Sequence, residues 1–114
     1  MARLGAARYS VLVSSLSLDL DRDDVQPYFV WDVPVTVGEL KRLLRHPDRK
    51  TRNMWTARVM REARYQDVWR FLRLQDVLKR YQDLRPHLGR ARPMWDFLIE
   101  GWQADGLIPK TNPT

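Results

Sequence analysis

Cysteine is absent from the chain. Its absence excludes disulfides, thiolate catalysis and cysteine-based zinc or iron–sulfur sites. A secreted domain of 114 residues often needs disulfides for stability, so the lack of cysteine predicts a cytoplasmic protein. Long apolar runs are lacking too: none approaches the roughly 18 residues of a membrane-spanning helix. We therefore expect no membrane partner.

Patterns that carry catalysis or hold cofactors are scarce. The two histidines, His46 and His87, each lie beside a proline and are not spaced four residues apart as helical metal ligands are. The aspartates that begin at Asp19 lack the glycine and glutamate of an EF-hand, because Asp24 and Val30 occupy those positions. The five glycines are scattered and form no phosphate-binding loop. We expect no catalytic residue, no metal and no cofactor, and therefore a protein that is not an enzyme.

Charge is distributed unevenly along the chain. Residues 41–92 contain 16 basic and five acidic side chains, whereas residues 1–40 and 93–114 are each net acidic. A segment this basic attracts nucleic acids or acidic protein surfaces. Solvated helix faces in an arginine-rich chain are the alternative interpretation, and composition does not decide between the two. The five tryptophans exceed what a core of this size needs, which is compatible with an interface, including a homodimer.

The expected fold class is mainly α, a compact bundle of four or five short helices with an extended N-terminal segment. Residues 1–26 form an N-terminal arm in which residues 9–20 are either a short strand or a helix. Residues 27–108 form the helical domain, and residues 109–114 a polar tail. The run from Pro27 to Pro34 is too short for a helix, so we expect it to lie extended across the core as a hydrophobic anchor.

Local signals place the helices. Thr36 and Glu39 form a capping box, and the helix they begin should stop before Pro47. A second helix runs from about Asp48 to about residue 64, a third begins near residue 67, and a fourth covers residues 74–81. The last helix runs from Arg92 or Pro93 to Ala104 on an apolar stripe, with Gly106 following in the left-handed conformation. The stripe consists of Trp95, Leu98, Ile99 and Trp102.

The second and third helices carry the candidate binding residues. They bring basic side chains next to tryptophans, a combination that contacts phosphates, stacks on bases or binds an acidic protein. The partner-binding hypothesis names Arg49, Lys50, Arg52, Trp55, Arg58, Arg61, Arg64, Trp69, Arg70 and Arg73. Two functions remain open at this point: a protein-binding regulator, or a small DNA- or RNA-binding protein that uses the arginine-rich helix.

Three segments resemble a group of short helical proteins. These are Tyr28-Phe29-Val30-Trp31-Asp32-Val33, then Arg58-Val59-Met60, then Tyr65-Gln66-Asp67-Val68-Trp69-Arg70-Phe71-Leu72, within residues 27–102. In that group an aromatic-Trp-Asp-Val segment precedes a helical stretch. The chain departs from the pattern at Pro34 and Val35, where acidic residues are usual, and at Ala63-Arg64, which replaces a turn that contains glycine.

Proteins of that group are often encoded beside nucleotidyltransferase toxins of the abortive-infection type and look like antitoxins. The resemblance implies that this chain is an antitoxin-like regulator in a toxin–antitoxin system. Its partner would then be an acidic protein, because a nucleotidyltransferase has a cleft lined by carboxylates. A basic helical surface could cover such a cleft and exclude the substrate.

Overall fold

A computed structural model describes residues 16–108, and this part of the chain is mainly helical. The helices are α2 (Val37–Leu43), α3 (Arg49–Glu62), α4 (Tyr65–Phe71), α5 (Leu74–Leu84) and α6 (Arg92–Ala104). Two short 3-10 helices, η1 (Arg85–His87) and η2 (Gly89–Ala91), connect α5 to α6. Strands β1 (Leu16–Ser17) and β2 (Gln26–Pro27) form a small parallel pair. The prediction of a mainly α fold is confirmed.

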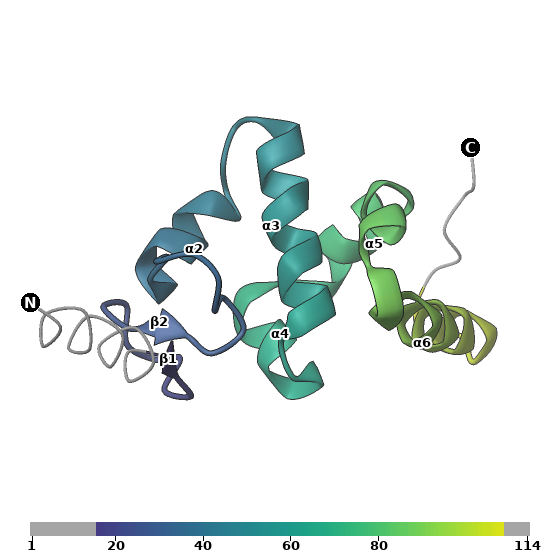
Figure 1. Cartoon of the computed structure of the whole chain (residues 1–114). Coiled ribbons are helices and arrows are strands. Elements are labelled where there is room, and N and C mark those ends of the chain that lie inside the picture. The colour runs from purple at the N-terminus through teal and green to yellow at the C-terminus, as the bar shows by residue number, and fades with distance from the viewer. Residues whose placement is uncertain (1–15, 109–114) are drawn as a thin grey trace, which may run out of the picture.

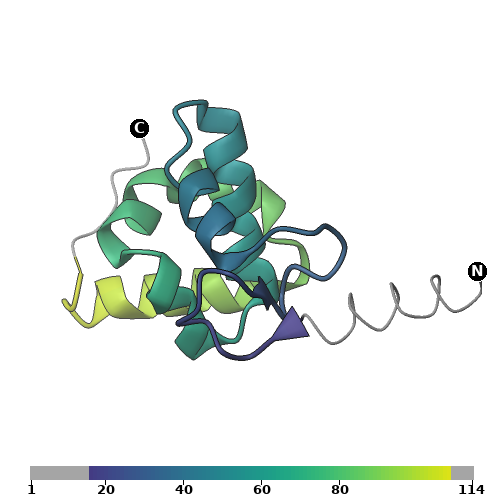
Figure 2. The same ribbon diagram turned by 90° about the vertical axis from the view of Figure 1, so that its left-hand side faces the viewer.

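Helix α3 is the centre of the arrangement. It contacts α2, α4, α5 and both 3-10 helices. Figure 1 shows α3 standing between α2 on one side and α5 on the other, with α4 beneath it. The view turned by 90° shows α6 running crosswise below α3 (Figure 2). None of these helices alone is long enough to be stable in water, so their packing against α3 holds them in place.

The ends of the helices follow the local signals in the sequence. The Thr36 hydroxyl accepts from the Glu39 N–H at 3.2 Å, and Glu39 accepts from the Thr36 N–H at 3.1 Å, which completes the capping box. At the start of α3, the Asp48 carboxylate accepts from the Thr51 N–H at 3.0 Å. Beyond α6, Gly106 has a φ of 73°, which a side chain would disfavour. The predicted capping box, the starts of α3, α5 and α6 and the left-handed glycine are confirmed, whereas α4 begins at Tyr65, two residues before the predicted start.

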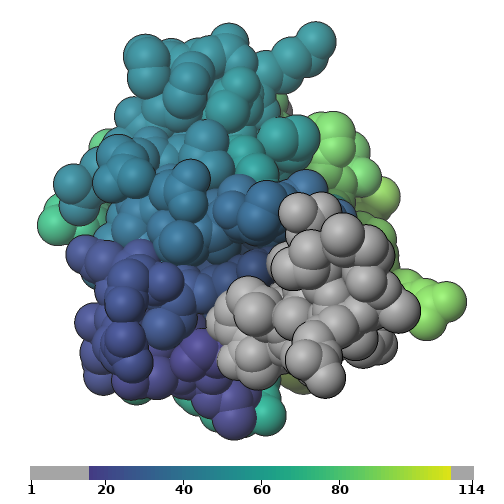
Figure 3. Space-filling view, turned by 60° about the vertical axis from the view of Figure 1, so that its left-hand side comes forward, coloured from purple at the N-terminus to yellow at the C-terminus, as the bar shows by residue number. Residues whose placement is uncertain are grey.

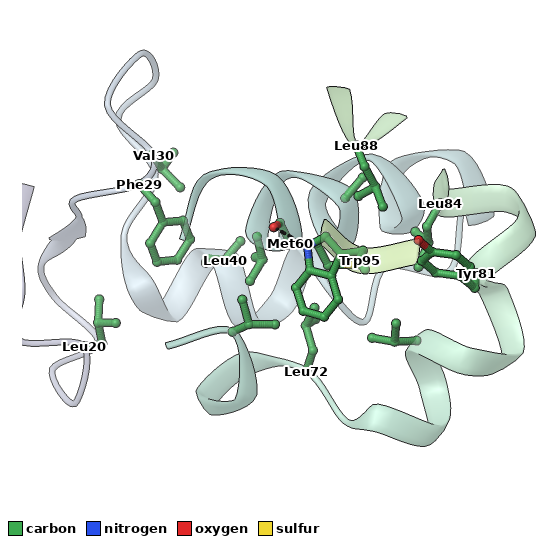
Figure 4. Packing of buried hydrophobic residues seen from close by; sticks show 14 of the residues in the cluster. Leu20, Phe29, Val30, Leu40, Met60, Leu72, Tyr81, Leu84, Leu88 and Trp95 are labelled. Atoms are coloured by element: carbon green, nitrogen blue, oxygen red, sulfur yellow. Dashed lines mark hydrogen bonds between the residues drawn. The ribbon is translucent and has the colours of Figure 1, made fainter. Parts of the chain in front are cut away.

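The core lies between these helices. Trp95 occupies its middle, with Met60 and Leu72 beside it and Phe29 towards the N-terminal side (Figure 4). The predicted stripe on α6 points inward, because Trp95 and Ile99 are buried and the other two members pack against the core. The Trp95 indole N–H donates to the Met60 carbonyl at 2.9 Å, so burying this polar group leaves no unsatisfied donor.

Two expectations for the N-terminal part need correction. The run 27–34 bends instead of extending, since the Val30 N–H donates back to the Pro27 carbonyl at 3.0 Å. The bend buries Phe29 but leaves Trp31 62% exposed, so the prediction that the run lies extended across the core as an anchor is wrong at Trp31. In the stretch 9–20, only Leu16–Ser17 is strand among the described residues, and residues 9–15 lie outside them. Leu18 is exposed, whereas Leu20 is buried in the core.

An acidic loop, residues 19–24, packs against the start of α2. The Gly38 N–H donates to the Asp23 carbonyl at 3.0 Å, and the Val37 N–H donates to the Val25 carbonyl at 2.8 Å. A Cβ atom on Gly38 would lie 3.2 Å from both the Cβ and the carbonyl oxygen of Asp23, so glycine permits this close approach. In the space-filling view, the dark-blue N-terminal loop lies directly against the blue surface of α2 (Figure 3).

Candidate interaction surface

A groove of about 700 Å³ follows the outward side of α3. We call it the α3 groove. Its walls are one side of α3 along nearly its whole length, the loop before Pro34 and the end of η1. It combines apolar side chains with cations, the mixture that protein interfaces use. The lining residues are Asp32, Val33, Asp48, Lys50, Thr51, Asn53, Met54, Trp55, Arg58, Arg61 and His87.

The loop that forms one wall of the α3 groove is fastened from both sides. The Gln26 amide, itself buried, donates to the carbonyls of Val30 and Val33 at 2.7 and 2.8 Å. From α3, the Arg58 Nε donates to the carbonyl of Phe29 at 3.2 Å. These contacts leave the backbone around residue 31 little freedom. The exposed indole of Trp31 is therefore held by a fixed loop.

Arg58 connects this loop to α3 electrostatically. Its guanidinium binds both carboxylate oxygens of Asp32, at 2.6 and 3.2 Å, and holds the pKa of that carboxyl below its usual range. The guanidinium carbon also lies 5.4 Å from the centroid of the Trp31 ring. Because only 12% of the Arg58 side chain is exposed, its principal role here is to position the loop.

The α3 groove brings together four of the ten residues in the partner-binding hypothesis: Lys50, Trp55, Arg58 and Arg61. Arg61 donates to the His87 carbonyl at 2.9 Å, which fixes the end of η1 at the groove. Lys50 is exposed at the beginning of α3, and its ammonium forms no ion pair with the described residues. The groove thus contains both structural and uncompensated cations.

Four of the other predicted residues have structural contacts away from this groove. Arg49 pairs with Asp83 of α5. Arg52 donates to the His46 carbonyl at 3.1 Å. Arg64 lies over the Tyr28 ring, 5.4 Å from its centroid. Trp69 packs edge-to-face on the buried indole of Trp95, with ring centroids 5.8 Å apart. These contacts account for the four side chains without a partner molecule.

The remaining two predicted residues, Arg70 and Arg73, line a second groove between α2 and α5. Arg70 pairs with Asp21 of the acidic loop at 2.7 Å. Arg73 is exposed immediately before α5. The arginine-rich region therefore does not form one continuous face, because α3 separates its side chains onto two surfaces.

Sequence reasoning missed Met54, which lines the α3 groove, and Trp31, which is not part of the lining but precedes Asp32 and Val33 on the same loop. Met54 is 57% exposed on α3, and Trp31 protrudes from that loop. Neither belonged to the expected site, because no pattern in the run 28–33 distinguishes an inward from an outward aromatic residue. The turn that separates Phe29 from Trp31 depends on Arg58, which lies far away in the sequence.

The described residues contain no cluster of three or more histidine or acidic side chains that could hold a metal ion. Within the same part of the chain, no helix has the length and apolar character to cross a bilayer. Comparison with family models, curated proteins and solved structures found no match for this chain.

Proposed function

We propose that the chain is a non-catalytic binding protein, an antitoxin-like regulator that binds and neutralises a nucleotidyltransferase-type toxin through the α3 groove. The observation that carries this proposal is the exposed Trp31, on the fastened loop that forms one wall of the groove, together with the exposed Met54 in the groove lining. Tryptophan and arginine dominate the binding energy of protein interfaces. A side chain that is already held in place loses little conformational entropy when a partner binds.

The charges around the groove favour an acidic partner. Lys50 projects an ammonium that forms no ion pair with the described residues, and the Arg61 side chain remains 33% exposed although it pairs with Glu62 at 3.0 Å. A carboxylate-lined cleft would meet these cations while the exposed indole and thioether enter an apolar part of the partner. Apolar anchors surrounded by complementary charge are the usual anatomy of a specific interface. The proposal also includes a cytoplasmic location, which the lack of cysteine predicts.

The test is co-expression with the product of the neighbouring gene, which the proposal expects to be a nucleotidyltransferase, followed by affinity purification and size-exclusion chromatography at about 150 mM salt. We expect one stable complex. Met54→Asp should abolish it, because the substitution places a negative charge in the middle of the groove. Leu107→Asp is the matched control: Leu107 is 70% exposed and does not line the groove.

Two results would overturn the proposal. One is the absence of any complex between the wild-type chain and the nucleotidyltransferase. The other is equal loss of the complex in the two aspartate variants, which would place the interface outside the α3 groove. Far-UV circular dichroism of both variants establishes that each is folded, as expected for substitutions of exposed side chains.

A further inference from the structure

A second groove, of about 500 Å³, lies between the C-terminal end of α2, the α4–α5 junction and α5. We call it the α2–α5 groove. It shares no lining residue with the α3 groove. Its charged side chains come from four different segments, and the cations outnumber the carboxylates. They are Lys41, Arg45, Arg70, Arg73, Arg80 and one acid, Asp76.

Much of this positive charge is not neutralised within the protein. The side chains of Arg45 and Arg73 are exposed and form no ion pair or hydrogen bond with residues 16–108. Arg80 donates to Asn53 Oδ1 at 2.9 Å, and this acceptor carries no charge. Partial burial, and next the nearby charge of Arg52, lower the pKa of Arg80. An anion in the groove would relieve this crowding of like charges.

The lining also indicates which anion fits. The exposed large apolar side chains of the described residues lie elsewhere, so this groove lacks the anchors of a protein interface. No buried side-chain nitrogen or oxygen among these residues lacks a partner, and therefore no closed cradle awaits a single small ion. Long, exposed cations spread along an open groove suit an extended chain of negative charges.

We propose that the α2–α5 groove binds the phosphodiester backbone of a nucleic acid, with Arg45 and Arg73 as its principal phosphate contacts. This site is independent of the proposed toxin-binding surface on α3. The contacts are to phosphates alone, so binding should be largely insensitive to base sequence. Backbone binding of this kind is governed by counterion release and weakens steeply with salt.

The acidic loop competes for the same cations. Asp21 pairs with Arg70 at 2.7 Å and Asp23 pairs with Lys41 at 2.8 Å, at one rim of the groove. Both carboxylates remain largely exposed, 80% for Asp21 and 68% for Asp23, so a phosphate can displace them. Removing their charge should therefore strengthen nucleic-acid binding, whereas removing the groove arginines should weaken it.

The test is fluorescence anisotropy of a labelled duplex of about 16 base pairs, titrated with the full chain at salt concentrations from about 50 to about 200 mM. We expect the double variant Arg45→Gln, Arg73→Gln to bind about tenfold more weakly at the lower salt. The slope of log K against log salt should become shallower by about 1.8, since each duplex phosphate contact contributes about 0.9.

Two variants make the measurement specific. Arg90→Gln removes one exposed, unpaired positive charge outside the groove and should change affinity by less than about twofold. Asp21→Asn with Asp23→Asn should raise affinity severalfold, a gain that an unfolded variant would not give. The proposal is overturned if Arg90→Gln weakens binding as much as Arg45→Gln or Arg73→Gln does when each of these is made alone. It is equally overturned if polyglutamate or pyrophosphate binds and the duplex does not.

Discussion

The end of α3 offers a sharp test of how the fold is held together. In a regular helix the Met60 carbonyl would accept from the Arg64 N–H, four residues later. Here the Arg64 N–H instead donates to the Tyr28 hydroxyl at 2.8 Å, and the Trp95 indole N–H donates to the Met60 carbonyl at 2.9 Å. Figure 4 shows the dashed line of this bond in the middle of the core. A side chain of α6 thus caps the helix on which the other helices pack.

Trp95→Phe should therefore be strongly destabilising. Leaving the buried Met60 carbonyl without its donor costs about 1–3 kcal/mol. The smaller ring adds about 1–2 kcal/mol for lost packing, because Trp95 is completely buried. Together the free energy of unfolding should fall by about 2–5 kcal/mol.

Urea denaturation followed by far-UV circular dichroism measures the change, with an m-value equal to that of the wild type. Phe97→Leu, at a position that is 74% exposed on the same helix, is the control and should change the free energy by less than about 0.5 kcal/mol. A loss below about 1 kcal/mol for Trp95→Phe would refute the capping role.

Three further predictions concern stability. Tyr28→Phe removes the hydroxyl that accepts from the Arg64 N–H and donates to Asp67 at 2.6 Å, so urea denaturation should show a loss of about 1–3 kcal/mol; an unchanged midpoint would contradict this. Trp31→Ala should lower the free energy of unfolding by about 1 kcal/mol, whereas Phe29→Ala, which removes a buried ring, should lower it by about 3–5 kcal/mol. Equal losses in the two variants would show that the Trp31 indole is part of the core. Hydrogen bonds from arginine lower the pKa of the carboxyls of Asp32 and Asp96. The free energy of unfolding should therefore be constant from about pH 7 to 5 and fall below about pH 4. A decline that began near pH 6 would point to other groups.

The sign of the pH effect follows from the ion pairs. The Arg85 guanidinium donates to both carboxylate oxygens of Asp96, at 2.8 and 2.9 Å, which favours the charged carboxylate in the folded state. A pKa lowered on folding contributes stability above the unfolded-state value of about 3.9, and this contribution disappears as the pH falls through the lower folded value. Asp96→Asn should therefore flatten part of the acid decline, as measured by urea midpoints across pH.

The helices could be predicted because their signals are local. A threonine and a glutamate three residues apart make the capping box at Thr36, and the aspartate before α3 binds an N–H only three residues later. The apolar stripe of α6 likewise repeats within two turns. Such patterns require no knowledge of the rest of the chain. The start and end of α6 consequently agree with the sequence prediction.

The candidate site could be predicted only in part, because it depends on contacts between distant residues. Composition identified a basic segment, but not that Arg58 would fasten the loop at Phe29 or that the acidic loop would pair with Lys41 and Arg70. These contacts join residues 18 to 49 positions apart. Whether an arginine is structural or available to a partner depends on such pairings, and local periodicity contains no information about them.

Neutralisation of a nucleotidyltransferase through the α3 groove is a proposal that enzyme kinetics can test. The most direct measurement is the rate of nucleotidyl transfer by that enzyme as the chain is titrated into the assay. We predict a linear loss of activity that ends at one equivalent of the wild-type chain, and no loss with the Met54→Asp variant. Full activity in the presence of a saturating excess of the wild-type chain would contradict the account.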